Sequence, residues 1–301
     1  MEMERNWLVG IPTFKRPSLL SAALSSLVKQ RDAPDFTVFV ADNDPKGSAR
    51  AVSARYSDSL RIKYGCESRP GVSHVRNLIL SEADEYELLA LLDDDQEAPE
   101  TWLAEMAAAA REFPDSVIVG PVNFDLQQAR REDPLVEIAF GRKQKPRGAK
   151  LMETGAGNCL LPMKEIEKRC PRIVFDAKFS HTGGEDTKFF RELSSAGIEI
   201  RWWPEAHVVE TVSEDRSTKN ETAQRFVRAG YINGVLRLEK SSRLTVLFGA
   251  ILRISAGCIM MLKGDRSTTG VNGRVRYLGG RGALKAALNR DMNYYGTGVG
   301  R

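Results

Sequence analysis

The stretch ELLALLDDDQ (residues 87–96) decides the fold of this chain. After Glu87 it runs through five apolar residues, as a strand does when both faces of its sheet are covered. Three carboxylates, Asp93, Asp94 and Asp95, then follow directly. In open α/β sheets, ligands bind beyond the carboxyl ends of the strands. The stretch therefore predicts a central strand and a binding site at its end.

Apolar runs and amphipathic segments alternate on both sides of this stretch. Short apolar or β-branched runs predict strands, and apolar residues at helical spacing predict helices. Such alternation through short links is typical of an α/β fold with a mostly parallel central sheet flanked by helices. The predicted strands besides 87–92 are 7–11, 37–41, 61–64, 117–119, 157–162, 198–203 and 206–212, and the predicted helices are 17–28, 72–80, 101–111, 185–196 and 218–238.

A long polar stretch, 127–150, interrupts this pattern. It contains RR and RKQKPRG and few apolar residues, which predicts a mobile loop. Its larger part, 130–150, is open to two interpretations: a lid that closes on a donor, or a plain solvated loop.

Composition limits the possible classes of protein. The chain has 301 residues, of which 42% are hydrophobic and 28% charged, so a packed core is available and extensive disorder is excluded. The four cysteines form no CxxC pair, which excludes a disulfide scaffold and a cysteine-rich zinc site. The N-terminal residues lack the apolar core of a signal peptide, so none is expected.

Charge divides the chain into two parts. Residues 237–301 hold twelve Lys or Arg against three Asp or Glu, a net charge of +9, which leaves −5 for residues 1–236 out of the +4 of the whole chain. We therefore expect a catalytic domain over 1–236 and a basic, apolar helical tail over 237–301. An anionic membrane surface is the expected partner of the tail. Nucleic acid is not expected, because the basic residues between Arg243 and Arg276 lack an interleaved set of aromatics, with Phe248 alone among them.

The tail contains an apolar stretch, 244–262, with one charge at Arg253. Its 19 residues are at the lower limit for crossing a bilayer. A charge at mid-depth costs about 3 kcal/mol on insertion scales. Flanking Arg243 and Lys263 favour a helix that lies in the membrane interface. Two alternatives stay open: a core helix packed on the catalytic body, and a true membrane span.

Acidic clusters follow three of the apolar or glycine-rich segments: Asp42 and Asp44 after TVFVA, the aspartate triplet after residue 92, and Glu185 with Asp186 after HTGG. Adjacent carboxylates repel one another unless a positive group lies between them, and Mg²⁺ or Mn²⁺ prefers oxygen ligands. Alternate side chains of an extended segment share a face, so Asp93 and Asp95 can act together. The alternatives are a solvated turn for the triplet and helix N-terminal acids for Glu185 and Asp186.

Seven motifs together resemble a known family. They are VGIPTFKRPSLLSAALSSL, VADND, RPGVSHVRN, LLDDDQ, TGAGNCLL, GGEDTKFFREL and WWPEAHVVE. In this order, over roughly residues 6–235, they resemble the family-2 glycosyltransferases of the GT-A fold, and most of all bacterial enzymes of exopolysaccharide or surface-glycan synthesis. VADND departs from the more usual VDDGS pattern. Glu210 stands where many relatives have His, which leaves the third metal ligand open.

The resemblance implies a set of donor-binding residues. Asp42 is similar to the aspartate that accepts from the ring N–H of the base, and Arg76 to the arginine that approaches the base or the phosphates. Asp93 matches the ribose contact, and Asp94 belongs with the donor-binding residues. The loop that cradles the base matches Pro12, Thr13 and Arg16.

The resemblance also implies the metal ligand and the base. Asp95 matches the ligand of Mn²⁺ or Mg²⁺ that bridges to the diphosphate, and Asp186 matches the catalytic base. Elementary chemistry agrees with this division. The departing diphosphate builds up negative charge, which a divalent ion neutralises, while a carboxylate on the opposite face of the sugar takes the acceptor proton. Attack opposite the leaving group inverts the anomeric centre.

The expected protein is thus an inverting, metal-dependent glycosyltransferase with a nucleotide-sugar donor, in the first instance a UDP-sugar. Its expected acceptor is a glycan or lipid-linked glycan of surface polysaccharide synthesis, and its expected place is the cytoplasmic face of the inner membrane, as a peripheral protein. Two alternatives remain. A sugar nucleotidyltransferase would carry a glycine-rich basic loop where this chain has GIPTFKRP. The other is a catalytically inactive, membrane-associated glycan-binding or scaffold protein.

Overall fold

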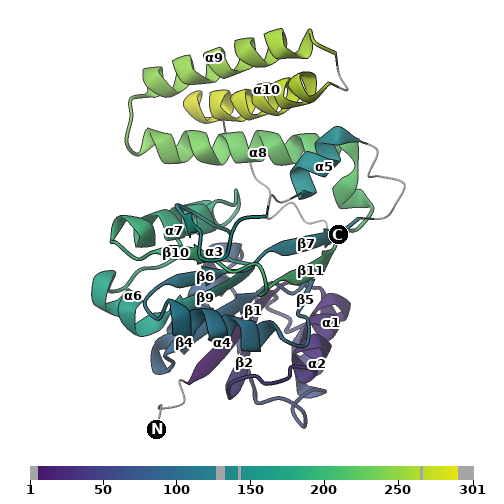
Figure 1. Ribbon diagram of the computed structural model, residues 1–301, viewed down its shortest axis with the longest axis vertical. Coiled ribbons are helices and arrows are strands. Elements are labelled where there is room, and N and C mark those ends of the chain that lie inside the picture. The colour runs from purple at the N-terminus through teal and green to yellow at the C-terminus, as the bar shows by residue number, and fades with distance from the viewer. Residues whose placement is uncertain (1–5, 127–132, 142–143, 265–266, 291–301) are drawn as a thin grey trace.

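The computed structural model describes residues 6–126, 133–141, 144–264 and 267–290 (Figure 1). An eight-stranded sheet forms its body, in the order β3-β2-β1-β4-β9-β6-β10-β8. The first four strands of that order pair in parallel: β3 (Ile62–Cys66), β2 (Phe36–Asp42), β1 (Trp7–Thr13) and β4 (Leu88–Leu92).

The second half of the sheet is mixed. Strand β9 (Asn158–Pro162) runs antiparallel to both β4 and β6 (Val117–Val119). Strand β10 (Ile200–Trp202) pairs in parallel with β6 and antiparallel with the short edge strand β8 (Lys150–Leu151). The prediction of a mostly parallel α/β sheet is confirmed, with β9 and β8 as its antiparallel strands.

Helices cover both faces of this sheet, and every residue of β4 is buried between them. One apolar cluster lies on the side of α1 (Pro17–Val28) and α4 (Trp102–Glu112), and the other on the side of α3 (Val72–Glu82) and α7 (Glu185–Ser195). Adjacent Trp202 and Trp203 belong to different clusters, so they point to opposite faces, as their alternation predicts. The remaining short helices of the body are α2 (Arg50–Ala54), α6 (Met163–Arg169) and the 3₁₀ turns η1 (Ala83–Glu85) and η3 (Ala177–Phe179).

A small second sheet lies beyond the end of β4 and positions the site. Its order is β5-β11-β7, made of β5 (Gln96–Glu97), β11 (Val208–Thr211) and β7 (Val122–Asp125). Strand β5 begins one residue after Asp95, and its Gln96 pairs with Glu210 of β11. This pairing brings a segment from late in the chain next to the aspartate triplet.

The predicted mobile loop contains a helix, α5 (Pro134–Phe140). Its N-cap Asp133 accepts a hydrogen bond from the backbone N–H of Leu135 at 2.9 Å, and Pro134 occupies the first turn. Val136 and Phe140 are buried and pack with Val212. The loop prediction is therefore wrong for 134–140, because these few apolar residues lie on one helical face. Residues 127–132 and 142–143 of the predicted loop lie outside the described residues.

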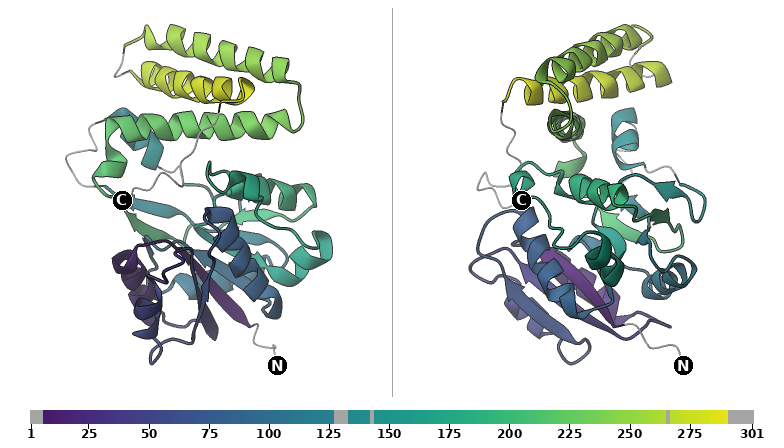
Figure 2. Two further views of the ribbon diagram at one scale, coloured as in Figure 1. Left: turned by 180° about the vertical axis from the view of Figure 1, so that it is seen from behind. Right: turned by 90° about the vertical axis from the view of Figure 1, so that its left-hand side faces the viewer.

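Three long helices form a separate layer above the body (Figures 1 and 2). They are α8 (Lys219–Leu238), α9 (Arg243–Met261) and α10 (Thr268–Ala287). Helix α8 faces the body, α10 lies on α8, and α9 is outermost. The predicted division between residues 236 and 237 falls inside α8, whose packing on α10 makes it part of this layer.

Glycines allow these helices to approach closely. A Cβ at Gly282 of α10 would lie 1.9 Å from the carbonyl oxygen of Val227 in α8, and one at Gly230 would lie 2.0 Å from that of Gly279. Helix α9 meets α10 in the same way at Gly257. Small residues at helix crossings are the usual means by which helices with few large contacts pack.

Helix α9 leaves most of its apolar surface exposed. Only 17% of its most apolar 18-residue stretch is buried, and among the described helices it alone is long and apolar enough to cross a membrane. Arg253 lies on its inner side, with its guanidinium near Gly279 of α10. The helix therefore does not complete the core of the catalytic body. The large apolar side chains it exposes, here called the outer face of α9, are Leu244, Phe248, Ile251, Leu252, Ile259 and Leu262.

Candidate active site

Several predicted site residues meet at the carboxyl ends of neighbouring strands. Thr13 ends β1, Asp42 ends β2, and these two residues are register partners. The triplet follows β4, which pairs with the other edge of β1. The parallel order of β2, β1 and β4 thus gathers the first two acidic clusters at one edge of the sheet.

The loop after β1 is tied to the triplet. The Thr13 hydroxyl donates a hydrogen bond to Asp94 Oδ2 at 2.7 Å, and the Arg16 guanidinium contacts Asp94 at 3.2 Å and Asp95 at 3.3 Å. Burial raises the pKa of Asp94 to about 6 although Arg16 acts in the opposite direction. Pro12 is half-buried in β1, one residue before the strand ends and this loop begins. Asp94 therefore holds the predicted base-binding loop in place through Thr13 and Arg16.

Asp42 is fully buried and its carboxylate organises the turn after β2. It accepts hydrogen bonds from the backbone N–H groups of Asp44 at 2.9 Å and Ala49 at 2.8 Å, and from the Tyr64 hydroxyl at 3.0 Å. These three donors come from the protein itself. The contact of Asp42 with a nucleotide base stays a prediction.

A buried arginine connects α3, the triplet and α7. The Arg76 guanidinium donates to Asp93 at 3.2 Å and to Glu185 through a short charged contact. Burial raises the pKa of Glu185 to about 7, while the charge of Arg76 acts to lower it. Arg76 thus fixes Asp93, the more exposed member of the triplet, relative to the start of α7.

Asp186 lies half-buried in the first turn of α7, after two glycines with positive φ, Gly183 at +76° and Gly184 at +100°. Its Oδ1 accepts the backbone N–H of Thr187 at 2.6 Å. The other carboxylate oxygen faces Gly155, at which a Cβ would lie 3.4 Å away.

The segment TGAGN (154–158) runs between the two acidic clusters. At Gly157 a Cβ would lie only 2.4 Å from Asp93 Oδ2 and 2.8 Å from Gln96 Nε2, so a side chain there would displace these two groups. Gly155, two residues earlier, lies beside Asp186. One short loop therefore separates the triplet from the predicted catalytic base, although Asp186 lies 91 positions after Asp95 in the sequence.

Sequence reasoning did not find Arg216, which lies in the 3₁₀ turn η4 (Asp215–Ser217) before α8. Its guanidinium contacts Asp95 Oδ2 at 3.0 Å and Glu210 Oε1 at 3.0 Å. Burial, followed by the charge of Asp95, raises the pKa of Glu210 to about 7. No local pattern could reveal Arg216, because it lies 121 positions from its partner Asp95.

The acidic residues fit a divalent cation in their chemistry. Burial and the charge of Asp93 raise the pKa of Asp95, just as the charge of Asp95 raises that of Glu210. Such mutual repulsion means that the cluster would be stabilised by more positive charge, and carboxylate oxygens suit Mn²⁺ or Mg²⁺. In their present arrangement the described residues contain no group of three or more His, Cys, Asp or Glu that could hold a metal ion. Arg216 stands between Asp95 and Glu210 instead.

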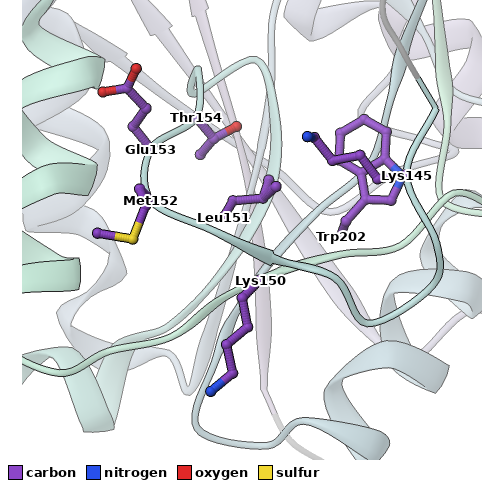
Figure 3. Close-up of a pocket in the computed structure, with 7 residues that line it drawn as sticks. All are labelled: Lys145, Lys150, Leu151, Met152, Glu153, Thr154 and Trp202. Atoms are coloured by element: carbon purple, nitrogen blue, oxygen red, sulfur yellow. The ribbon is translucent and has the colours of Figure 1, made fainter.

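An open hollow of about 420 Å³ lies beside the sheet edge formed by β8 and β10 (Figure 3). Trp202 of β10 contributes to its wall, and the indole N–H of this residue is buried without a hydrogen-bond partner among the described groups. Thr154, at the start of TGAGN, lines the same hollow. The hollow therefore adjoins the loop that contacts Asp186. The other residues around it are Lys145, Lys150, Leu151, Met152 and Glu153.

Known proteins resemble this chain in sequence. The model of glycosyl transferase family 2 matches residues 8–167. The succinoglycan biosynthesis protein ExoM of Rhizobium meliloti (strain 1021) is 29% identical over 256 residues, which cover 78% of this chain and 76% of that protein. The chondroitin synthase of Pasteurella multocida (strain Pm70) is 27% identical over 225 residues, 64% of this chain but only 23% of the synthase.

Solved structures show the same fold. Staphylococcus aureus TarS 1–349 in complex with UDP-GlcNAc superposes with a TM-score of 0.56 at 15% identity, over 94% of this chain and 92% of that one. The mannosyltransferase PcManGT from Pyrobaculum calidifontis, in complex with GDP-Man and Mn²⁺, gives 0.57 at 15% identity, over 96% and 74%. The fold is thus the GT-A-like α/β fold with a C-terminal helical region. Since the family model covers more than half of the residues, the chain belongs to glycosyl transferase family 2.

Proposed function

We propose that this glycosyltransferase is an inverting, divalent-cation-dependent enzyme that transfers a sugar from a UDP-sugar to a glycan or lipid-linked acceptor in surface polysaccharide synthesis. The observation that carries the proposal is the separation of two acidic groups by the TGAGN loop. The leaving diphosphate needs a positive charge on one side of the sugar, and the acceptor hydroxyl needs a proton acceptor on the other side. One group of carboxylates can hold the cation, and a carboxylate on a different element can take the proton.

On the leaving-group side, Asp95 and Glu210 would hold Mn²⁺ or Mg²⁺, and Asp93 the ribose. When bound, the ion would neutralise charge on the departing diphosphate. At the position where many relatives have His, the carboxylate of Glu210 is a suitable oxygen ligand for such an ion. The donor's base would lie against the loop that begins at Pro12 and Thr13, with Asp42 and Arg76 as the further donor contacts.

On the acceptor side, Asp186 would take the proton of the attacking hydroxyl. It lies in the first turn of α7, where the helix dipole stabilises negative charge. Attack from this side, opposite the diphosphate, inverts the anomeric centre in one displacement. The hollow beside Thr154 and Trp202 adjoins this side and is a suitable place for the acceptor glycan.

The test is a transfer assay with a panel of UDP- and GDP-sugars and glycan acceptors, with and without Mn²⁺, for the wild type and Asp186→Asn. We expect metal-dependent transfer, an inverted anomeric centre by NMR, and a loss of at least about a hundredfold in kcat for Asp186→Asn with donor affinity retained. Glu192→Gln, an exposed carboxylate of the same helix, serves as the matched control. A retained anomeric configuration, or near wild-type transfer by Asp186→Asn, would contradict the assignment. The two alternatives, a nucleotidyltransferase and an inactive scaffold, predict no sugar transfer at all.

We also propose that the outer face of α9 lies on an anionic membrane surface, so that the protein is peripheral, on the cytoplasmic face of the inner membrane. Three observations support this. The outer face is apolar, Arg253 is on the inner side, and Arg243 and Lys263 flank the helix. Apolar burial and attraction of basic residues to anionic lipids then act together. Because Arg253 need not enter the lipid, an interfacial position avoids the cost of burying that charge.

A further inference from the structure

Arg216 occupies the place between the two carboxylates that are best suited to a divalent cation. One guanidinium contacts Asp95 through one nitrogen and Glu210 through another, each at 3.0 Å. These two oxygens therefore lie within the span of a single planar group. A cation placed between the two carboxylates would take the same oxygens that Arg216 now contacts.

The neighbouring Arg16 does not play the same part. It also contacts Asp95 Oδ2, at 3.3 Å, but it is anchored to Asp94 at 3.2 Å, and Asp94 in turn accepts from Thr13. Arg16 thus belongs to the loop after β1. Arg216 alone, among the described residues, bridges Asp95 to Glu210.

Arg216 is placed so that it can leave. It lies in η4, a single 3₁₀ turn between β11 and α8, and its side chain is 35% exposed while those of its two partners are about a tenth exposed. The carboxylates cannot follow it into solvent, because Asp95 is fixed by the end of β4 and Glu210 by β11. Loss of the guanidinium without replacement would leave two buried like charges together, which is unfavourable.

We propose that Arg216 is an internal counter-ion of the Asp95–Glu210 pair, and that the divalent cation of the nucleotide complex displaces it. The inference rests on the metal dependence in the proposed function. It bears on the order in which the cation and the nucleotide bind. Without a nucleotide the cation must compete with Arg216 for the same carboxylates. With UDP present, the diphosphate supplies further oxygens to the cation and also a new anionic partner for the released guanidinium. Cation and nucleotide should therefore bind with strong mutual coupling.

The experiment measures Mn²⁺ binding to the full chain by calorimetry and by the EPR signal of free Mn²⁺, without UDP and with saturating UDP. Arg216→Gln should bind Mn²⁺ without UDP at least about tenfold more tightly than the wild type, since a charge this close shifts such equilibria by one or more decades. Its coupling between Mn²⁺ and UDP should fall by a similar factor.

Two control variants accompany it. Lys219→Gln removes an equal charge three residues away, from an exposed side chain that contacts Asp133, and should bind Mn²⁺ like the wild type. Arg216→Lys keeps the charge and should stay within about threefold of the wild type. Thermal melts confirm that each variant is folded.

The proposal is overturned if Arg216→Gln binds Mn²⁺ without UDP no more tightly than the wild type. If this variant loses UDP affinity without any gain in Mn²⁺ affinity, Arg216 is a permanent substitute for the cation, and the proposal is equally wrong. Failure of the proposed function gives a different result, because the wild type would then bind no Mn²⁺ even with saturating UDP.

Discussion

The outer face of α9 allows a test of membrane association that leaves the fold intact. Phe248 is 64% exposed and Leu252 is 53% exposed, so replacing both with Gln removes apolar surface that the folded protein does not use for packing. Exposed substitutions of this kind change the free energy of unfolding by about 0.5 kcal/mol or less. Any change in lipid binding then reports on the face itself.

The expected loss of binding follows from the exposed fractions. Full burial of a Phe or Leu side chain contributes about 1.5–3 kcal/mol. Scaled by what is still exposed, Phe248 contributes about 1.5 kcal/mol and Leu252 about 1 kcal/mol on entering the interface. Their joint loss of about 2.5 kcal/mol corresponds to a decrease of about sixty-fold in the partition coefficient.

The assay is co-sedimentation with vesicles that contain anionic lipid and with neutral vesicles, at low and high salt. We expect the wild type to bind anionic vesicles, with binding weakened by salt because the basic flanks are screened. The double variant should lose most of the binding at both salt concentrations. Leu19→Gln with Val28→Gln, two exposed apolar residues of α1 in the catalytic body, is the matched control and should bind like the wild type.

Two outcomes would refute this reasoning. One is a wild type that does not sediment with anionic vesicles. The other is an equal loss in the α1 control and the α9 variant, which would mean that general surface hydrophobicity, and not the outer face of α9, governs adsorption.

Two further predictions concern stability. The pKa of Glu210 is raised to about 7 in the folded chain. Between about pH 4.5 and pH 7 the metal-free native state therefore keeps a proton that the unfolded state loses. The free energy of unfolding falls as the pH rises through this range, because the unfolded state binds fewer protons than the native state. Glu210→Gln should therefore gain about 3 kcal/mol relative to the wild type between pH 4.5 and pH 8, measured by urea unfolding in EDTA, whereas a difference independent of pH would show that Glu210 titrates normally. Gly282→Val places a side chain against the α8 backbone and should cost about 3 kcal/mol. Gly249→Val, whose Cβ would meet only the Arg237 guanidinium at 3.9 Å, should melt close to the wild type, and equal melting of both variants would argue against close packing of α8 on α10.

Local patterns predicted most elements of the body. Strand β4 could be identified from five consecutive apolar residues, and α3 from apolar residues at helical spacing, because burial on both faces or on one face leaves a direct trace in a short segment. Short α5 escaped prediction, since its few apolar residues are surrounded by charges and gain their burial from Val212 and α8. The meeting of Thr13, Arg16 and the triplet also follows from local motifs, once the strands are assumed to be parallel neighbours.

The sequence alone determined which segments are apolar, where carboxylates follow these segments, and that the tail is basic and apolar. Only the tertiary structure decided which distant groups meet. Glu210 lies beside Asp95 because β11 pairs with β5, and Arg216 joins them because η4 follows that strand. Close contacts at glycines between α9 and α10 decided that the side of α9 with Arg253 faces α10. The physical reason is that periodicity records the environment of a residue within a few positions, whereas a charge pair or a helix crossing depends on strand order and backbone approach across the whole chain.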